Sequence, residues 1–283
     1  MAIQPTTLTS GMRANLVALQ KTDTALEVTQ KRLSTGKKVN SALDDPVSYF
    51  TALAHEQRAG DLAARKDEMS EGIQTVKAAD AGIESIRSLI AAAKSLATSA
   101  LSGETTSDIT TLMNQYHQVL AQIDTIADDS GYKGINLLDS SNVTTQVKFD
   151  ELGNSNLTMT GFDASATGAT LTLMSFTTGN QWVSAGGTAD KLDINSGIAR
   201  LDSATRALRT ESSKLANNLS IITARQDYTQ SMINVLKDGA AGLTNADMNE
   251  ESASMLMLQT RQSLGTTSLS LASQSAQSVL RLF

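Results

Sequence analysis

Residues 194–236 carry an unbroken heptad pattern, and this feature constrains the fold most strongly. Apolar or small polar side chains recur there in alternating steps of four and three, which is typical of a helix that packs lengthwise against other helices. A helix of this length spans roughly 65 Å at about 1.5 Å per residue, more than a compact globule of this size needs. We therefore expect long helices elsewhere in the chain to pack against it. The positions are Ile194, Ile198, Leu201, Thr205, Leu208, Ser212, Leu215, Leu219, Ile222, Gln226, Thr229, Ile233 and Leu236.

Partners for this helix are predicted upstream. A long helix is expected from Pro46 to about Leu101, because Asp45 can cap its first amides and proline is tolerated at the first helical position. A third helix, capped by Ser107, is expected to end around Ser130–Gly131. The clearest heptad positions of the long helix are Val76, Ala79, Ile83, Ile86, Ile90, Ala93 and Ala97, and those of the third are Ile109, Leu112, Tyr116, Val119, Ile123 and Ile126.

Both ends of the chain also predict helices. The first begins near Thr9 and ends at Gly36, with a stripe at Met12, Leu16, Leu19, Asp23, Leu26, Gln30 and Leu33. We expect Gly239 and Gly242 to stop the helix of residues 194–236, and a polar connector over 244–249 to precede the last helix. This last helix has no charge between Arg261 and Arg281, yet it is too polar to span a bilayer. Its stripe contains Leu258, Gln262, Gly265, Leu269, Ala272, Ala276, Val279 and Phe283, widened by Leu264 and Leu271.

Residues 131–187 differ in character, because Thr, Ser, Gly and Asn dominate. Short alternating runs predict strands at 145–149, 156–162 and 169–176, with turns at Gly153–Asn154 and Thr167–Gly168. The fold class is therefore mainly α: a long antiparallel coiled-coil rod with a small β-hairpin-rich segment, and with both chain ends at one end of the rod. The expected parts are an N-terminal helix with its connector (1–43), rod helices (44–139), an outer β-rich segment (140–188), a C-terminal rod helix (189–243) and a C-terminal helix (244–283).

Composition excludes several classes of protein. Aromatic residues make up only 4% of the chain and proline occurs twice, which suits helices packed through aliphatic side chains. A net charge of −6 and the lack of a basic patch argue against nucleic-acid binding. The absence of cysteine excludes disulfides and thiolate metal sites. Residues 1–16 lack the features of a secretory signal peptide, so we expect any export to use another route.

No set of residues predicts catalysis, a cofactor or a metal. His55 and His117 fall on different predicted helices, without a second histidine at ligand spacing. Asp44 and Asp45 could bind a cation, although a helix cap is the stronger interpretation. We therefore expect no enzyme, and we expect the two terminal helices to pair with each other and to contact other subunits. The expected self-assembly residues are Leu8, Met12, Leu16, Leu19, Leu26, Leu33, Leu258, Leu264, Leu269, Leu271, Val279 and Phe283.

Several blocks resemble bacterial flagellin. They are KRLSTGKKVNSALDD (31–45), the helix over 71–100, IDTIADDSGYKGINLL (123–138), Ala224–Arg225–Gln226, Asn245 to Ser252 and the uncharged C-terminal helix. Their order and spacing cover most of the chain outside residues 140–188. Residues 46–50 and 245–251 look most like flagellins of rhizobia and their relatives, and the short middle segment indicates a short flagellin.

The resemblance implies a structural subunit that self-assembles into the extracellular flagellar filament used for swimming. Its partners would be further copies of itself, the flagellar type III export apparatus, a chaperone of the C-terminal helix, and hook-associated junction and cap proteins, without nucleic acid or membrane. Export would need no cleaved signal peptide. Terminal segments disordered in the monomer would become helical as copies stack. Two alternatives stay open: a hook-filament junction protein that forms a single ring, and a type III secreted coiled-coil protein.

One departure from the family concerns recognition by animals. Flagellins sensed by the Toll-like flagellin receptor carry arginine and glutamate at the positions that match Ala92 and Gln115, whereas the matching leucine, Leu96, is kept. The resemblance therefore predicts weak or absent activation of this receptor.

Overall fold

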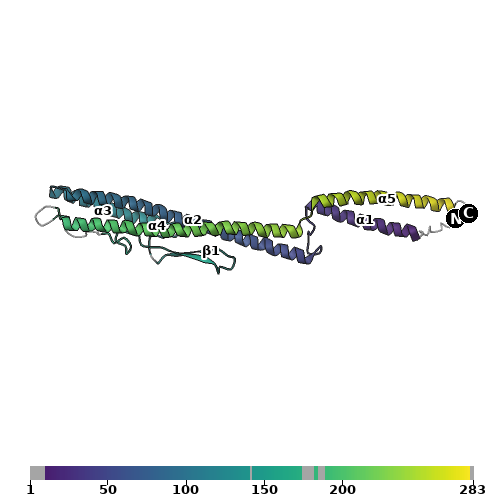
Figure 1. Cartoon of the computed structure of the whole chain (residues 1–283), viewed down its shortest axis with the longest axis horizontal. Coiled ribbons are helices and arrows are strands. Elements are labelled where there is room, and N and C mark those ends of the chain that lie inside the picture. The colour runs from purple at the N-terminus through teal and green to yellow at the C-terminus, as the bar shows by residue number, and fades with distance from the viewer. Residues whose placement is uncertain (1–9, 141, 174–181, 184–188, 281–283) are drawn as a thin grey trace. The chain divides into compact units, whose positions relative to one another are not determined.

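The computed structural model describes residues 10–140, 142–173, 182–183 and 189–280, apart from the side chains of 276, 279 and 280. The described residues form five helices and one two-stranded antiparallel sheet (Figure 1). They belong to two compact units: a terminal unit of residues 1–57 and 235–283, and a central unit of residues 58–234. The mainly α fold with a small β-hairpin is thereby confirmed.

Three long helices build the central unit: α2 (Pro46–Leu101), α3 (Thr106–Asp129) and α4 (Lys191–Thr244), of which α2 and α4 continue into the terminal unit. Helices α2 and α4 run antiparallel, because successive residues of α2 along the chain contact α4 residues with decreasing residue numbers. The pairs are Ser70 with Gln226 (2.7 Å), Asp80 with Ser212 (2.9 Å) and Lys94 with Asp202 (2.5 Å).

The predicted heptad positions form the core of this bundle. Ile194, Leu201, Leu208 and Ile222 of α4 are fully buried, and the polar positions of the same stripe are at least partly buried. All seven predicted positions of α2 between Val76 and Ala97 are 2% exposed or less. Both stripes therefore pack inside the chain.

Two glycines of α2 permit close contacts with other elements. A Cβ at Gly72 would lie 2.6 Å from Cγ2 of Val147, and one at Gly82 would lie 2.6 Å from Cδ1 of Leu138. Real Cβ atoms essentially never come this close, so the missing side chains allow the hairpin and the turn after α3 to pack directly on α2.

The sheet is a hairpin of β1 (Thr144–Lys148) and β2 (Asn156–Thr160), paired from Thr144 opposite Thr160 to Lys148 opposite Asn156. Val147 and Met159 are buried against the helices, whereas alternate residues face solvent. In the loop between the strands, Gly153 has a φ of 74°. Both strands lie within one or two residues of their predicted positions.

The third predicted strand is wrong over its described residues. Residues 169–173 form turns, in which Thr172 N donates to Gly168 O (2.9 Å) and Leu173 N donates to Ala166 O (2.7 Å). These turns bury Leu171 and Leu173 without strand pairing. The alternation of apolar residues in this segment therefore indicated buried side chains and not a strand. Residues 174–176 of that prediction lie outside the described residues.

Three predicted helix ends also differ from the structure. Thr105, not Ser107, caps α3, because its hydroxyl accepts a hydrogen bond from Asp108 N at 3.2 Å. Helix α4 continues through Gly239 and Gly242 to Thr244, since neither glycine has a positive φ. The connector before the last helix is consequently shorter than predicted, at residues 245–247.

The terminal unit contains α1 (Ser10–Thr35) and α5 (Met248–Leu280). The connectors at their inner ends are joined by backbone hydrogen bonds: Lys38 N donates to Thr244 O (2.7 Å) and Ala246 N donates to Gly36 O (3.0 Å). The start of α2 is capped as predicted, because Asp45 Oδ1 accepts from Val47 N (3.1 Å) and Ser48 N (3.2 Å). Within the described residues, no helix combines the length and apolarity needed to cross a membrane.

Candidate self-assembly interface

The site begins with the pairing of α1 and α5. The two helices run antiparallel, as shown by contacts of Leu19 with Gly265, Asp23 with Gln262 (3.3 Å) and Arg32 with Glu251 (2.9 Å). Both contribute a heptad seam, the predicted arrangement for paired terminal helices. The seam residues are Met12, Asn15, Leu19, Thr22, Leu26, Thr29 and Leu33 of α1, with Met255, Leu258, Gln262, Gly265, Leu269 and Ala272 of α5.

The predicted stripe of α5 agrees with the structure from Leu258 to Ala272, whereas the side chains of Ala276, Val279 and Phe283 lie outside the description. The predicted stripe of α1 is partly wrong. Asn15, Thr22 and Thr29 take the positions expected for Leu16, Asp23 and Gln30, which are exposed. Thr29 is only 6% exposed, and its hydroxyl can bond within its own helix, as serine and threonine hydroxyls commonly do. The pattern placed a leucine in the seam where the fold places a small polar residue.

A second row of apolar side chains runs along α5 on a face that α1 does not cover. We call Met257, Leu264 and Leu271 the α5 outer row; they lie seven residues apart and are 55%, 66% and 66% exposed. Residues seven apart are rotated by only about 20° around a helix, so the three side chains lie on one face of α5. The row is an uncovered coiled-coil face in the described chain.

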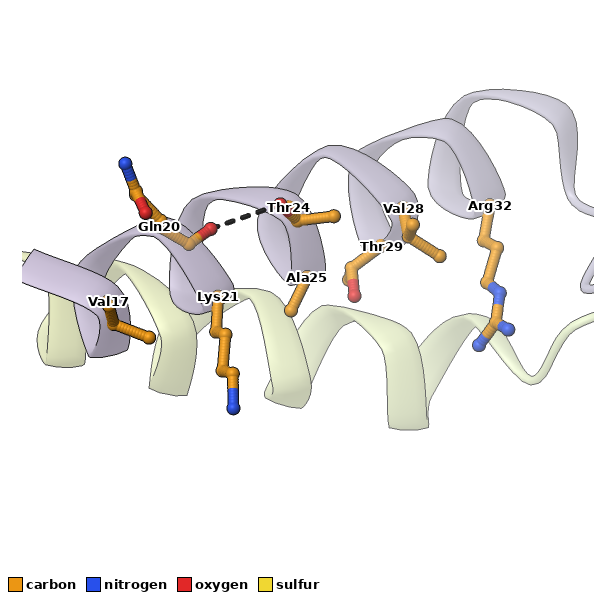
Figure 2. A pocket seen from close by; sticks show the side chains of 8 residues that line it. All are labelled: Val17, Gln20, Lys21, Thr24, Ala25, Val28, Thr29 and Arg32. Carbon is orange, nitrogen blue, oxygen red and sulfur yellow. Dashed lines mark hydrogen bonds between the residues drawn. The ribbon is translucent and has the colours of Figure 1, made fainter.

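Helix α1 carries a groove beside α5, shown in Figure 2. It is a shallow, open hollow with a volume of about 640 Å³, in which two exposed valines, Val17 (49%) and Val28 (44%), lie among polar side chains. Val17, Lys21, Thr24 and Val28 follow steps of four, three and four, so this groove also has coiled-coil spacing. We call its eight lining residues the α1 groove: Val17, Gln20, Lys21, Thr24, Ala25, Val28, Thr29 and Arg32.

The predicted interface residues divide into three groups. Met12, Leu19, Leu26, Leu33, Leu258 and Leu269 lie in the seam within the chain, whereas Leu16, Leu264 and Leu271 are exposed. Leu8, the side chain of Val279, and Phe283 lie outside the described residues. Val17, Val28 and Met257 were missed, although a search for a second heptad row on each terminal helix would have found them.

Charged groups near the connector stabilise local structure. The hydroxyl of Ser48 donates a hydrogen bond to Asp45, which lowers the pKa of that carboxyl. The backbone N–H groups of Asn40 and Ser41 donate to Asp44 and lower its pKa in the same way. Both carboxylates are therefore engaged with their own backbone. In the described part of the chain, no three His, Cys, Asp or Glu side chains are grouped so that they could hold a metal ion.

The two receptor-related positions lie in the central unit. Ala92 of α2 and Gln115 of α3 are exposed, and Leu96 is partly buried. Their exposure means that either position can contact another protein.

The fold and this interface define a class of protein: a long-helix subunit whose first and last helices pair and leave coiled-coil faces uncovered. The chain matches the bacterial flagellin N-terminal helical region over residues 6–143 and the bacterial flagellin C-terminal helical region over residues 198–283. The chain belongs to the bacterial flagellin family, and it is a structural subunit of the flagellar filament.

Two flagellins of known sequence agree with this assignment. Flagellin FljM of Caulobacter vibrioides is 31% identical over 289 residues, with all of both chains covered. A flagellin of Brucella melitensis is 28% identical, with 95% of both chains covered. The crystal structure of Bacillus cereus flagellin superposes with a TM-score of 0.45 at 17% identity, covering 58% of this chain and 88% of that one.

Proposed function

We propose that the subunit assembles through the faces that the α1–α5 pair leaves uncovered, with the α5 outer row of one copy packing into the α1 groove of the next. The observation that carries this proposal is the coiled-coil spacing of both faces, at Val17–Lys21–Thr24–Val28 and at Met257–Leu264–Leu271. A helix with two heptad rows on different faces can join two partners at once. Here the first partner is the other terminal helix of the same chain.

The symmetry of a filament supports two different faces. A surface that binds a copy of itself closes into a dimer, whereas a head-to-tail contact between different surfaces generates an open helix when the rotation does not close. The α5 outer row and the α1 groove are such a pair of different surfaces. Further contacts by Leu8, Leu16, Val279 and Phe283 would extend the same interface.

Energetics support contacts through these leucines. Burial of one leucine contributes about 1.5–3 kcal/mol, and the contact recurs with every added copy. Helix α5 is uncharged between Arg261 and Arg281, so burying its outer row leaves no charge without a partner in that stretch. This burial offsets the entropy lost when the terminal segments become ordered.

We further propose that the subunit has no enzymatic activity and leaves the cell through the flagellar type III export apparatus, without a cleaved signal peptide. A cytosolic chaperone would cover the C-terminal helix before assembly, which suits a helix that exposes Leu264 and Leu271. Hook-associated junction and cap proteins would contact the two ends of the filament. The family resemblance supports these partners.

The test replaces Leu264 and Leu271 by serine in the full chain and measures polymerisation by sedimentation and negative-stain electron microscopy. Leu192→Ser is the matched control, because Leu192 is 81% exposed but lies in α4 of the central unit. The expected result is long filaments from the control and none from the double variant. Normal filaments from the double variant would overturn the proposal, and short rings from the unaltered chain would favour a junction protein.

A further inference from the structure

Methionine is the only residue of this chain whose sulfur can be oxidised, because cysteine is absent. Among the described residues, exposure separates the methionines clearly. Met69, Met113 and Met159 are buried at 8% exposure or less, Met12, Met232 and Met255 are partly buried, and Met248 and Met257 are 45% and 55% exposed. Among the described methionines, oxidation should therefore begin at Met248 and Met257.

Only one of these two exposed thioethers lies in the α5 outer row. Met257 is one heptad before Leu264, whereas Met248 is the first residue of α5. One turn from Met257 on either side lie Ala253, Thr260 and Arg261, and the side chain of Met257 stays 55% exposed among them. The most exposed of the described methionines therefore occupies a position that has to be apolar for the proposed packing.

We propose that Met257 is an oxidation site that controls assembly, an inference that rests on the proposed role of the α5 outer row. Hydrogen peroxide transfers one oxygen atom to the thioether sulfur, which loses two electrons and becomes a sulfoxide, while the peroxide is reduced to water. The sulfoxide is a polar group in place of a flexible apolar one. Burying this polar group costs free energy, because its oxygen loses hydrogen bonds to water where it packs against the valines of the α1 groove, Val17 and Val28.

Two further consequences follow from the same geometry. The assembled filament covers Met257, so its sulfur reacts more slowly with peroxide than the sulfur of the free subunit does. The change is also reversible, because methionine sulfoxide reductases with a thiol reductant return the sulfoxide to the thioether and release the oxygen as water.

The experiment treats free subunits of the unaltered chain, Met257→Leu and Met248→Leu with hydrogen peroxide, removes the peroxide, and measures filament yield by sedimentation. Peptide mass spectrometry measures the oxidised fraction at each methionine. Leucine keeps the volume and apolarity of methionine without the sulfur, so untreated Met257→Leu should assemble normally. We expect treated unaltered chain and treated Met248→Leu to need about tenfold more protein for assembly, and treated Met257→Leu to be unaffected.

Recovery of assembly after reductase treatment is also expected. The proposal is overturned if treated Met257→Leu loses assembly as strongly as the unaltered chain, or if chains fully oxidised at Met257 assemble normally. The Leu264→Ser/Leu271→Ser variant shows whether a negative result contradicts the methionine proposal alone or the proposed interface as well. If that untreated variant assembles, the interface proposal is wrong; if it does not assemble while oxidised unaltered chain does, only the methionine proposal is wrong.

Discussion

Leu19 of α1 occupies the space above Gly265 of α5: a Cβ at Gly265 would lie 2.6 Å from Cδ2 of Leu19 and 3.1 Å from its Cγ. Both residues lie in the seam, and this close approach fixes which part of α5 faces which part of α1. In knobs-into-holes packing, a glycine on one helix deepens the hole that receives the leucine of the other. The register of the terminal pair therefore depends on the missing side chain at Gly265.

We predict that Gly265→Val weakens filaments by forcing the two helices apart. Overpacking of this kind costs about 1–3 kcal/mol, which corresponds to a rise of roughly 5- to 150-fold in the protein concentration needed for assembly. The matched control is Gly242→Val at the end of α4, where a Cβ would meet nothing within 4 Å. Light scattering during heating measures the temperature at which filaments dissolve, and equal temperatures for the two variants would contradict the prediction.

Two glycines of α2 should respond oppositely to the same substitution. Gly72→Ala places a methyl group 2.6 Å from Cγ2 of the stiff, buried Val147, so we expect a loss of about 1–3 kcal/mol in the free energy of unfolding. Gly60→Ala meets nothing within 4 Å and should add about 0.5–1 kcal/mol. Urea unfolding followed by fluorescence measures both, because Trp182 is the single tryptophan and is fully buried in the central unit. A stabilising Gly72→Ala would contradict the predicted contact.

The central unit should lose stability at high pH through Tyr116. Burial raises the pKa of this phenol to about 12, from 10.0 in an unperturbed tyrosine. Above pH 10 the unfolded chain therefore loses this proton while the folded chain keeps it, so stability falls between pH 10 and about pH 12. The full shift corresponds to roughly 2–3 kcal/mol.

Tyr116→Phe removes this titration, so the variant should show a smaller decrease in the free energy of unfolding between pH 9 and pH 11.5 than the unaltered chain. The ring of Tyr116 lies 5.0 Å from that of Trp182, so fluorescence reports the relevant part of the core. Parallel pH profiles of the two chains would show that Tyr116 is not responsible.

The sequence predicted the long helices accurately because each buries one stripe over its whole length. The seven heptad positions from Val76 to Ala97 are nearly all inaccessible to solvent, so apolar residues occupy every one of them and the pattern is easy to recognise. The ends of elements were predicted less well. Thr105 and Ser107 are both residue types that cap helices, so the sequence could not decide between them. Glycine favours a helix end where the backbone takes a positive φ, and neither Gly239 nor Gly242 has one.

The buried and exposed faces of the terminal helices were predicted only in part, for a physical reason. A heptad stripe identifies a face that is buried, but not the surface that buries it. The seam of α1 contains Asn15, Thr22 and Thr29, which are weaker signals than the exposed Leu16 beside them. Only the structure separates the seam within the chain from the α5 outer row and the α1 groove.

We predict that the protein activates the animal flagellin receptor weakly. Ala92 and Gln115 are exposed but supply neither the guanidinium nor the carboxylate of flagellins that this receptor senses. The double variant Ala92→Arg/Gln115→Glu should raise the response in a cell reporter assay, and Ala91→Arg, at a neighbouring exposed position, should not. A full response to the unaltered chain would refute this prediction.

The most direct test of the account uses the natural absence of cysteine. Chains carrying only Val17→Cys are mixed with chains carrying only Leu264→Cys, assembled, and oxidised mildly. A disulfide between the two variants requires Cα atoms about 4.4–6.8 Å apart, so it reports contact between the α1 groove of one copy and the α5 outer row of another. We expect mixed dimers from filaments and not from free subunits; abundant filaments without mixed dimers would contradict the proposed interface.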